Sequence, residues 1–122
     1  TNREPDKNEI LDLHFAWNVC RLVRSNAIVF AKNNSMIGMG SGQPNRVTSV
    51  YLSGRLSGEQ SVGASMASDA FFPFADGIEL AAKYGIKSVI QPGGSIRDEE
   101  VISIANKLDM TMIFTGTRHF FH

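Results

Sequence analysis

A segment with two glycines, residues 91–95, is the first candidate for chemistry because it lies between a predicted strand and a predicted helix. In open α/β sheets, ligands bind at this place, outside the carboxyl end of a strand and at the N-terminus of the next helix. The segment contains neither a Walker loop nor a complete dinucleotide fingerprint. It is therefore either a ligand-binding loop or a tight connection in which glycine only permits the turn.

Three phenylalanines surround Pro73 just before a predicted helix: Phe71, Phe72 and Phe74. Because three neighbouring rings cannot all face the same core, one of them is able to form a flat wall for a planar ligand. Composition alone favours the alternative, in which all three rings lie in the core or in an interface. Asp76, at the start of the helix, has the default role of an N-cap.

The last residues, 118–122, combine an arginine, two histidines and two phenylalanines. Such a tail can bind an anion, and the strand before it is expected to be central or near-central in the sheet. The alternative is a frayed terminus, because chain ends are often disordered unless they are tied down. Arg24 and Arg46, near polar turns, are either binding cations or solvated charges, and His14 is expected on the exposed side of the first helix.

Two enzyme classes lack their signatures here. A zinc deaminase needs His-x-Glu followed by Pro-Cys-x-x-Cys, and neither motif is present. A serine hydrolase needs the Gly-x-Ser-x-Gly elbow, which is also absent. Taken alone, the residues predict an α/β domain with a site for a small anion or a planar ligand.

Composition narrows the possible partners. The 122 residues carry 12 basic and 12 acidic side chains, so the excess of cations that nucleic-acid binding uses is missing. The single cysteine, Cys20, excludes an internal disulfide and favours a reducing compartment. No apolar run is long enough to span a membrane or to form a signal-peptide core, so we expect a cytoplasmic protein. Because residue 1 is Thr, we expect a chain cut from something longer.

The first helix is expected over residues 5–23, with Asp6 and Glu9 as a capping box. Two apolar rows run along it, so we expect it to be covered on more than one side. The first row is Ile10, Leu13, Trp17 and Cys20, and the second is Leu11, Phe15, Val19 and Leu22.

The remaining elements alternate between strands and helices. The first strands are expected over 27–31 and 36–40, joined by an asparagine turn, and are followed by a helical segment from 47 whose pattern ends near 54 and by a loop over 57–65. A strand from 66, a helix from 76 and a strand over 87–90 come next. The last two elements are a helix that begins with a capping box of Ser95 and Asp98 and a strand over 111–115. This alternation predicts a largely parallel sheet flanked by helices, which the opening hairpin makes mixed. We expect one domain over residues 1–122.

Five segments resemble the C-terminal region of the bifunctional AICAR transformylase/IMP cyclohydrolase family: residues 25–33, 37–46, 68–77, 89–100 and 114–120. The resemblance implies a three-layer α/β/α, cytidine-deaminase-like subdomain with a mixed sheet and no zinc. The resemblance implies that two such subdomains form the transformylase and that its active sites lie at a homodimer interface. The family transfers a formyl group from 10-formyltetrahydrofolate to the 5-amino group of AICAR in IMP biosynthesis.

The resemblance also implies roles for single residues. Asn26 is similar to a residue at the carboxamide and amine of AICAR, and His122 to a histidine of the active site, so both are catalytic candidates. The implied AICAR-binding residues are Asn26, Arg46, Val47, Phe71, Arg118 and Phe120. Those implied for the folate pocket are Pro73, Phe74, Asp76 and Ser95. Ser25 and Asp69 match a potassium site.

Some of the family's features are missing from this chain. The Lys-His pair that acts as general acid and base belongs to the other, N-terminal transformylase subdomain, so we expect this chain alone to be close to inert. Bacterial relatives usually carry Arg at the positions of Ala75 and Phe121. The alternative function is a non-catalytic module that binds a purine ribotide or a folate, and a weaker one is a degenerate fragment kept for dimerisation.

Overall fold

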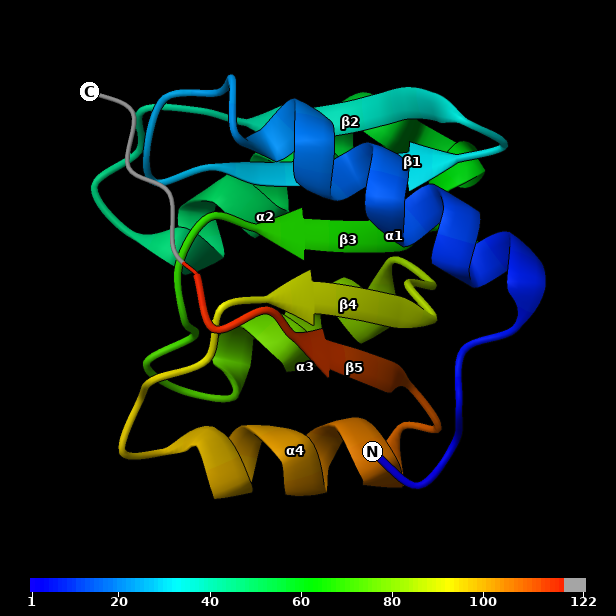
Figure 1. The fold of residues 1–122 in the computed structure, drawn as a ribbon. Helices are drawn as coiled ribbons and strands as arrows, with labels where there is room; N and C mark the ends of the chain where they lie inside the picture. Colours follow the sequence, from blue (N-terminus) through cyan, green and yellow to red (C-terminus); the bar gives the residue numbers. More distant parts are fainter. Residues whose placement is uncertain (118–122) are drawn as a thin grey trace.

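A five-stranded mixed sheet organises the computed structural model, which describes residues 1–117 (Figure 1). The strand order is β2-β1-β3-β4-β5; β1 is antiparallel to β2 and β3, and β3, β4 and β5 are parallel. The elements are α1 (Lys7–Cys20), β1 (Ile28–Lys32), β2 (Ser35–Gly40), α2 (Arg46–Ser57), the 3-10 helix η1 (Gly58–Ser61), β3 (Ser65–Ser68), α3 (Asp76–Lys83), β4 (Ser88–Gln91), α4 (Asp98–Lys107) and β5 (Thr111–Phe114). The predicted mixed sheet is confirmed.

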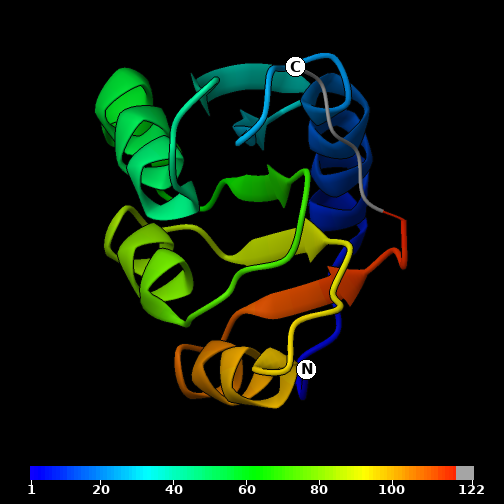
Figure 2. The same ribbon diagram turned by 90° about the vertical axis from the view of Figure 1, so that its left-hand side faces the viewer.

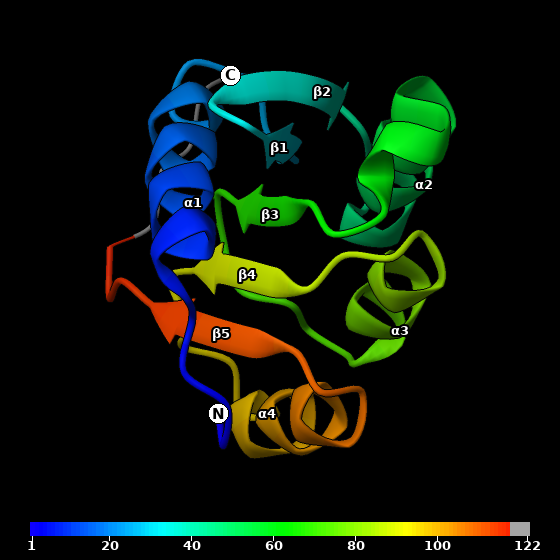
Figure 3. The same ribbon diagram turned by 90° about the vertical axis from the view of Figure 1, so that its right-hand side faces the viewer.

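Helices cover both faces of the sheet. Helix α1 lies on one face, and α2, α3 and α4 lie on the other (Figures 2 and 3). The side chains of strand β1 pack against helices on both faces of the sheet. Ile28 and Phe30 lie on the side of the three helices, and Val29 lies on the side of α1. Both faces of this strand are therefore buried, which explains its continuous apolar run. The three-layer prediction is confirmed.

The hairpin between β1 and β2 turns at two asparagines. Asn33 and Asn34 have φ values of 53° and 59°, the left-handed conformation that a two-residue type I′ turn requires. The carboxylate of Asp12 on α1 accepts both of their backbone N–H groups, at 3.3 and 3.0 Å. Helix α1 thus fixes the turn that the sequence predicts.

Helix α1 has the predicted capping box but not the predicted second apolar contact. The Asp6 side chain accepts from the Glu9 backbone, and the Glu9 side chain accepts from the Asp6 backbone. Leu11 is 54% exposed because only one side of the helix faces the sheet, and Leu22 is 77% exposed because the helix ends at Cys20 rather than at residue 23, so the expectation of cover on several sides is wrong for them. His14 is exposed, as expected.

Two predicted boundaries need correction. Helix α2 does not dissolve near Gly54 but continues to Ser57, and η1 lies in the expected loop. Gly54 suits the helix because the ring of Tyr84 packs where a side chain would stand. The expected capping box of Ser95 and Asp98 is only half present: the Asp98 carboxylate accepts from the Ser95 backbone, but the Ser95 hydroxyl accepts from the Arg97 backbone and not from Asp98. Helix α4 begins only at Asp98, and its N-cap, Arg97, makes no side-chain hydrogen bond.

Strand β5 lies at the edge of the sheet, so the expectation of a central or near-central strand is wrong. The order of strands depends on which neighbours pair over long sequence distances, and local patterns do not contain that information. None of the helices in residues 1–117 combines the length and the apolar character that crossing a membrane requires.

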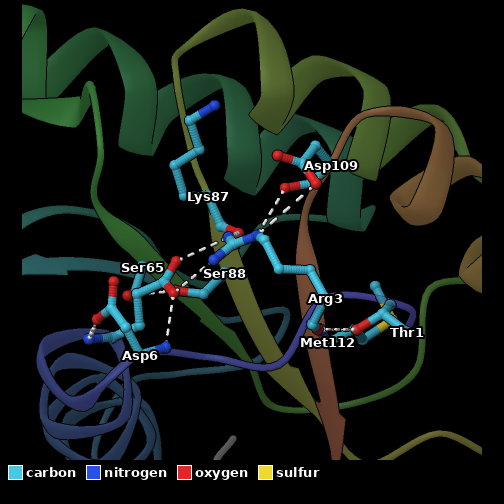
Figure 4. Close-up of polar contacts among 9 residues, drawn as sticks. Thr1, Arg3, Asp6, Ser65, Lys87, Ser88, Asp109 and Met112 are labelled. Carbon is cyan, nitrogen blue, oxygen red and sulfur yellow. Dashed lines mark hydrogen bonds and ion pairs between the residues drawn. The ribbon is translucent and has the colours of Figure 1, made fainter.

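The N-terminal segment crosses the amino edge of the parallel strands and is held by Arg3 (Figure 4). Its guanidinium donates to both carboxylate oxygens of Glu9, at 2.8 and 2.9 Å, and to the backbone oxygens of Lys87 and Asp109, at 2.9 and 3.1 Å. The hydrogen bond with Glu9 raises the pKa of Arg3 above its ordinary value. One side chain thus joins the start of α1 to the starts of β4 and β5.

Replacing Arg3 with methionine is expected to lower the free energy of unfolding by about 1–2 kcal/mol, because nearly buried Glu9 loses its charged donor. Urea denaturation measures the change. The matched control, Arg21→Met, removes an exposed arginine at the end of α1 and is expected to change stability by less than about 0.5 kcal/mol. Equal losses in both variants would show that Arg3 does not hold the segment.

Candidate active site at the carboxyl edge of the sheet

Loops from distant parts of the sequence meet at one edge of the sheet. Ile28 at the start of β1 pairs with Gly40 at the end of β2 and with Ser68 at the end of β3. Strands β4 and β5 run parallel to β3, so they end at the same edge, on the left of Figure 1. Within residues 1–117, the segments that carry the resemblance to the transformylase therefore meet at this edge, as sheet topology requires.

Arg46, the first residue of α2, forms the buried centre of this edge. Its side chain is 7% exposed and makes an ion pair with Asp69, which is 1% exposed. The nitrogen that contacts Asp69 also donates to Ser68 Oγ at 3.0 Å and to the backbone oxygen of Ala27 at 3.4 Å. Its charge is therefore balanced inside the protein.

The amide of Asn26 is held in one orientation by Arg46 and by the neighbouring loop. Its Oδ1 accepts from Arg46 Nη2 at 2.8 Å, and its Nδ2 donates to the backbone oxygen of Gln43 at 3.0 Å. Ser49 on α2 donates to the Asn26 backbone oxygen at 2.6 Å. A side chain fixed by so many contacts offers its remaining donor capacity in a defined direction.

An open pocket of about 300 Å³ lies above these groups. It brings together four of the predicted residues, Asn26, Arg46, Phe71 and Pro73. Sequence reasoning missed its other lining residues, Pro44, Asn45 and Ala70. Asn45 carried a usable signal, because an asparagine before a helix is a typical N-cap, and here it accepts from the Thr48 backbone at 2.9 Å.

A larger hollow of about 450 Å³ lies at the opposite edge of the sheet, near Arg3 and Glu9. None of the predicted site residues lines it. The acidic groups Asp6, Glu9 and Asp12 along it accept hydrogen bonds from the protein itself. We therefore place the candidate site at the carboxyl edge.

The three phenylalanines have different surroundings. Phe72 is 1% exposed in the core, Phe71 is half-buried and lines the pocket, and Phe74 is 53% exposed. The guanidinium of Arg97 lies over the Phe74 ring, 4.9 Å from its centre. Phe71 and Phe74 therefore do not lie in the core of this chain and are available to a ligand, while the alternative that they lie in an interface stays a prediction.

The other residues predicted for the folate pocket flank this edge. Asp76 is exposed at the first position of α3, where its carboxylate accepts from the Gly77 backbone at 2.8 Å. Ser95 is half-buried on the loop after β4. Val47, which was predicted for AICAR binding, is half-buried as the second residue of α2. Asp76 is thus not the N-cap; that position belongs to Ala75.

Ser25 and Asp69, the predicted potassium ligands, lie together. Ser25 donates from Oγ to Asp69 Oδ2 at 2.5 Å. The two side chains offer oxygen donors, which is the ligand type that alkali and alkaline-earth cations take, although Arg46 already balances the Asp69 charge. Within residues 1–117, no group of three or more His, Cys, Asp and Glu side chains could hold a metal ion. Potassium binding and the lack of zinc stay predictions.

The predicted residues Arg118, Phe120 and His122 lie outside the described residues.

Cys20, the last residue of α1, is buried between this helix and the sheet. Its thiol donates to the backbone oxygen of Ala27, and burial raises the pKa of the thiol above its ordinary value.

Solved structures share the fold. RibD from Acinetobacter baumannii superposes with a TM-score of 0.63 at 17% identity, over 86% of this chain and 35% of that chain. A diaminohydroxyphosphoribosylaminopyrimidine deaminase/5-amino-6-(5-phosphoribosylamino)uracil reductase from Thermotoga maritima gives 0.57 at 15% identity, over 87% of this chain and 36% of that chain. Together with the topology, these define a cytidine-deaminase-like α/β/α domain.

Sequence comparison shows similarity to one family of purine biosynthesis proteins. Residues 1–55 match the family model of the AICARFT/IMPCHase bienzyme. The bifunctional purine biosynthesis proteins PurH of Prochlorococcus marinus and of a Synechocystis species are 52% and 51% identical to this chain over all 122 residues. The chain is similar to proteins of this family along its whole length, and it spans 24% of the length of each of these two relatives.

Proposed function

We propose that this chain forms part of a folate-dependent formyltransferase of purine biosynthesis and supplies one wall of its active site. The supporting observation is the convergence of predicted residues around one open pocket, from the loop before β1, the start of α2 and the loop after β3. The formyl group would move from 10-formyltetrahydrofolate to the 5-amino group of AICAR. The names of the relatives support the role in purine biosynthesis.

In this proposal, Asn26 and Arg46 act as a unit on AICAR. Asn26 Nδ2 has two N–H donors, of which Gln43 takes one, and an amide pairs well with the carboxamide of AICAR. Asp69 balances the charge of Arg46, so Arg46 is poorly suited to binding a phosphate. Its role in this proposal is to orient the Asn26 amide and to donate its remaining N–H groups to AICAR. Phe71 then provides a flat wall for the imidazole.

The folate would lie on the neighbouring loops. Pro73 lines the pocket, and Phe74 presents an exposed ring beside it. The exposed Asp76 carboxylate is an acceptor for the donor edge of a pterin. In this proposal, Ser95, on the loop after β4, forms a further part of the folate pocket.

Proton transfer would depend on a second piece of polypeptide. Removing a proton from the 5-amino group needs a positioned base, and such groups contribute about 10²- to 10⁴-fold in rate. We propose that the base comes from the N-terminal transformylase subdomain of a cytoplasmic homodimer, so that this chain alone is nearly inactive. Potassium would support Ser25 and Asp69 structurally, and no chemical step depends on it.

Mixing this chain with the remaining part of a relative, with the folding of both confirmed, is expected to restore formyl transfer from 10-formyltetrahydrofolate to AICAR. Asn26→Ala should lower the rate at least about tenfold, because it removes a hydrogen-bonding group from the pocket. The matched control, Asn18→Ala, changes an exposed asparagine on α1 and should leave the rate unchanged. An absorbance assay of folate release measures both.

Two results would contradict the proposal. Closure of the formylated product to IMP that appears only when this chain is added, without formyl transfer, would assign the chain to the cyclohydrolase. Calorimetry on the isolated chain gives the second test, because half a site should bind AICAR or folate only at about millimolar concentration. Binding at micromolar concentration without catalysis would instead identify a binding module.

A further inference from the structure

Arg97 bridges two loops that carry residues predicted for the folate pocket. Phe74 lies on the loop after β3, and Arg97 lies beside Ser95 on the loop after β4. The guanidinium carbon of Arg97 stands 4.9 Å from the centre of the Phe74 ring, within the range of a cation–π contact. No role for Arg97 follows from the resemblance or from the relatives.

The backbone that carries Arg97 is fixed. The Asp98 carboxylate accepts from the backbone N–H groups of Gly94 and Ser95, at 2.8 and 3.1 Å. Ser95 Oγ in turn accepts from the Arg97 backbone at 3.0 Å. The polar pair that sequence reasoning took for a helix cap therefore braces the loop and sets the direction in which Arg97 leaves it.

The side chain of Arg97 is held from a second side by Glu100. Arg97 Nη1 donates to Glu100 Oε2 at 3.1 Å, and both side chains remain about half exposed. An ion pair at this exposure contributes little stability. Its effect is to favour one position of the guanidinium, which lies over a phenylalanine that is itself 53% exposed.

We propose that Arg97 is a positioning residue for the planar ring of the folate co-substrate and acts through Phe74. By holding the Phe74 ring against the loop after β4, it sets the distance between the stacking surface and Ser95. This inference rests on the proposed function. It follows that loss of Arg97 weakens the use of folate and leaves the use of AICAR unaffected, because the Asn26 and Arg46 unit has other supports.

The test uses the reconstituted enzyme. Arg97→Ala is expected to raise the KM for 10-formyltetrahydrofolate about fivefold, with kcat at saturating folate and the KM for AICAR unchanged. Arg97→Lys, which keeps the charge but not the planar group, should give a smaller rise, as should Glu100→Gln. The matched control, Arg55→Ala, removes the second cation that lies over a ring within residues 1–117, 6.0 Å from the centre of the Tyr51 ring on α2, and should change neither KM.

A second measurement does not depend on activity. In NMR spectra of this chain, the ring current of Phe74 should shift the Arg97 side-chain protons upfield, and Phe74→Leu should abolish the shift. Absence of the shift overturns the contact on which the inference depends. An unchanged folate KM in Arg97→Ala overturns the positioning role, and a lower KM shows that Arg97 blocks the ring instead. If the wild-type enzyme transfers no formyl group while the NMR shift is present, the proposed function fails, and the folate role of Arg97 fails with it.

Discussion

Replacing Arg46 with methionine is expected to lower the free energy of unfolding by about 3–5 kcal/mol, because it leaves the buried carboxylate of Asp69 without its cation. The substitution keeps much of the aliphatic volume of the side chain, so most of the loss comes from the unpaired charge. It also removes the donors to Ser68 and Asn26. Urea denaturation followed by circular dichroism measures the change.

The double variant Arg46→Met/Asp69→Asn tests the cause. If the unpaired carboxylate is responsible, the second substitution should recover more than half of the lost stability, since it removes the charge and keeps the shape. Equal losses in the single and double variants would show that the contacts of Arg46 with Ser68 and Asn26 matter more than the ion pair. A loss below about 1 kcal/mol in the single variant would place the pair among weak surface interactions.

Replacing Gly40 with alanine is expected to lower the free energy of unfolding by about 3 kcal/mol, at the upper end for overpacking. A Cβ at this position would stand 2.2 Å from the backbone oxygen of Ser49 and 2.5 Å from its Cα. Backbone atoms of α2 cannot rotate away as a side chain can, so β2 and α2 must separate. Thermal and urea denaturation measure the loss.

Gly42→Ala is the matched control for this packing effect. Gly42 has a φ of 64° and no atom within 4 Å of an added Cβ, so alanine meets only backbone strain there, about 1–2 kcal/mol. We expect the loss at Gly40 to be clearly larger. Equal losses would mean that β2 and α2 can move apart easily, and that the start of α2, with Arg46, is less firmly positioned than the structure indicates.

Local patterns in the sequence were sufficient for the hairpin, the first capping box and the alternation of strands and helices. Each depends on residues within a few positions of one another, such as Asn33 with Asn34 or Asp6 with Glu9. The topology of the sheet then brought the loops to one edge. The meeting of Asn26, Arg46, Phe71 and Pro73 at one pocket followed the resemblance to the family and agrees with that topology.

Contacts between distant residues could not be predicted. Nothing near Arg46 indicates that Asp69 balances its charge, and an arginine near a polar turn was equally consistent with a solvated charge. The edge position of β5 depends on pairing with β4 alone, which a buried apolar strand does not reveal. Ser95 and Asp98 show the same limit at short range, because their spacing suits a helix cap and also suits the braced loop that the structure contains.

The outer side of β5 is partly occupied by the beginning of the chain. The Thr1 hydroxyl accepts from the backbone N–H of Met112, and the Asn2 backbone donates to the side chain of Asn106 on α4. An unpaired edge strand is a template for pairing with strands of other molecules. The hydroxyl of Thr1 therefore takes up a backbone donor of β5 that a strand of another molecule would otherwise pair with.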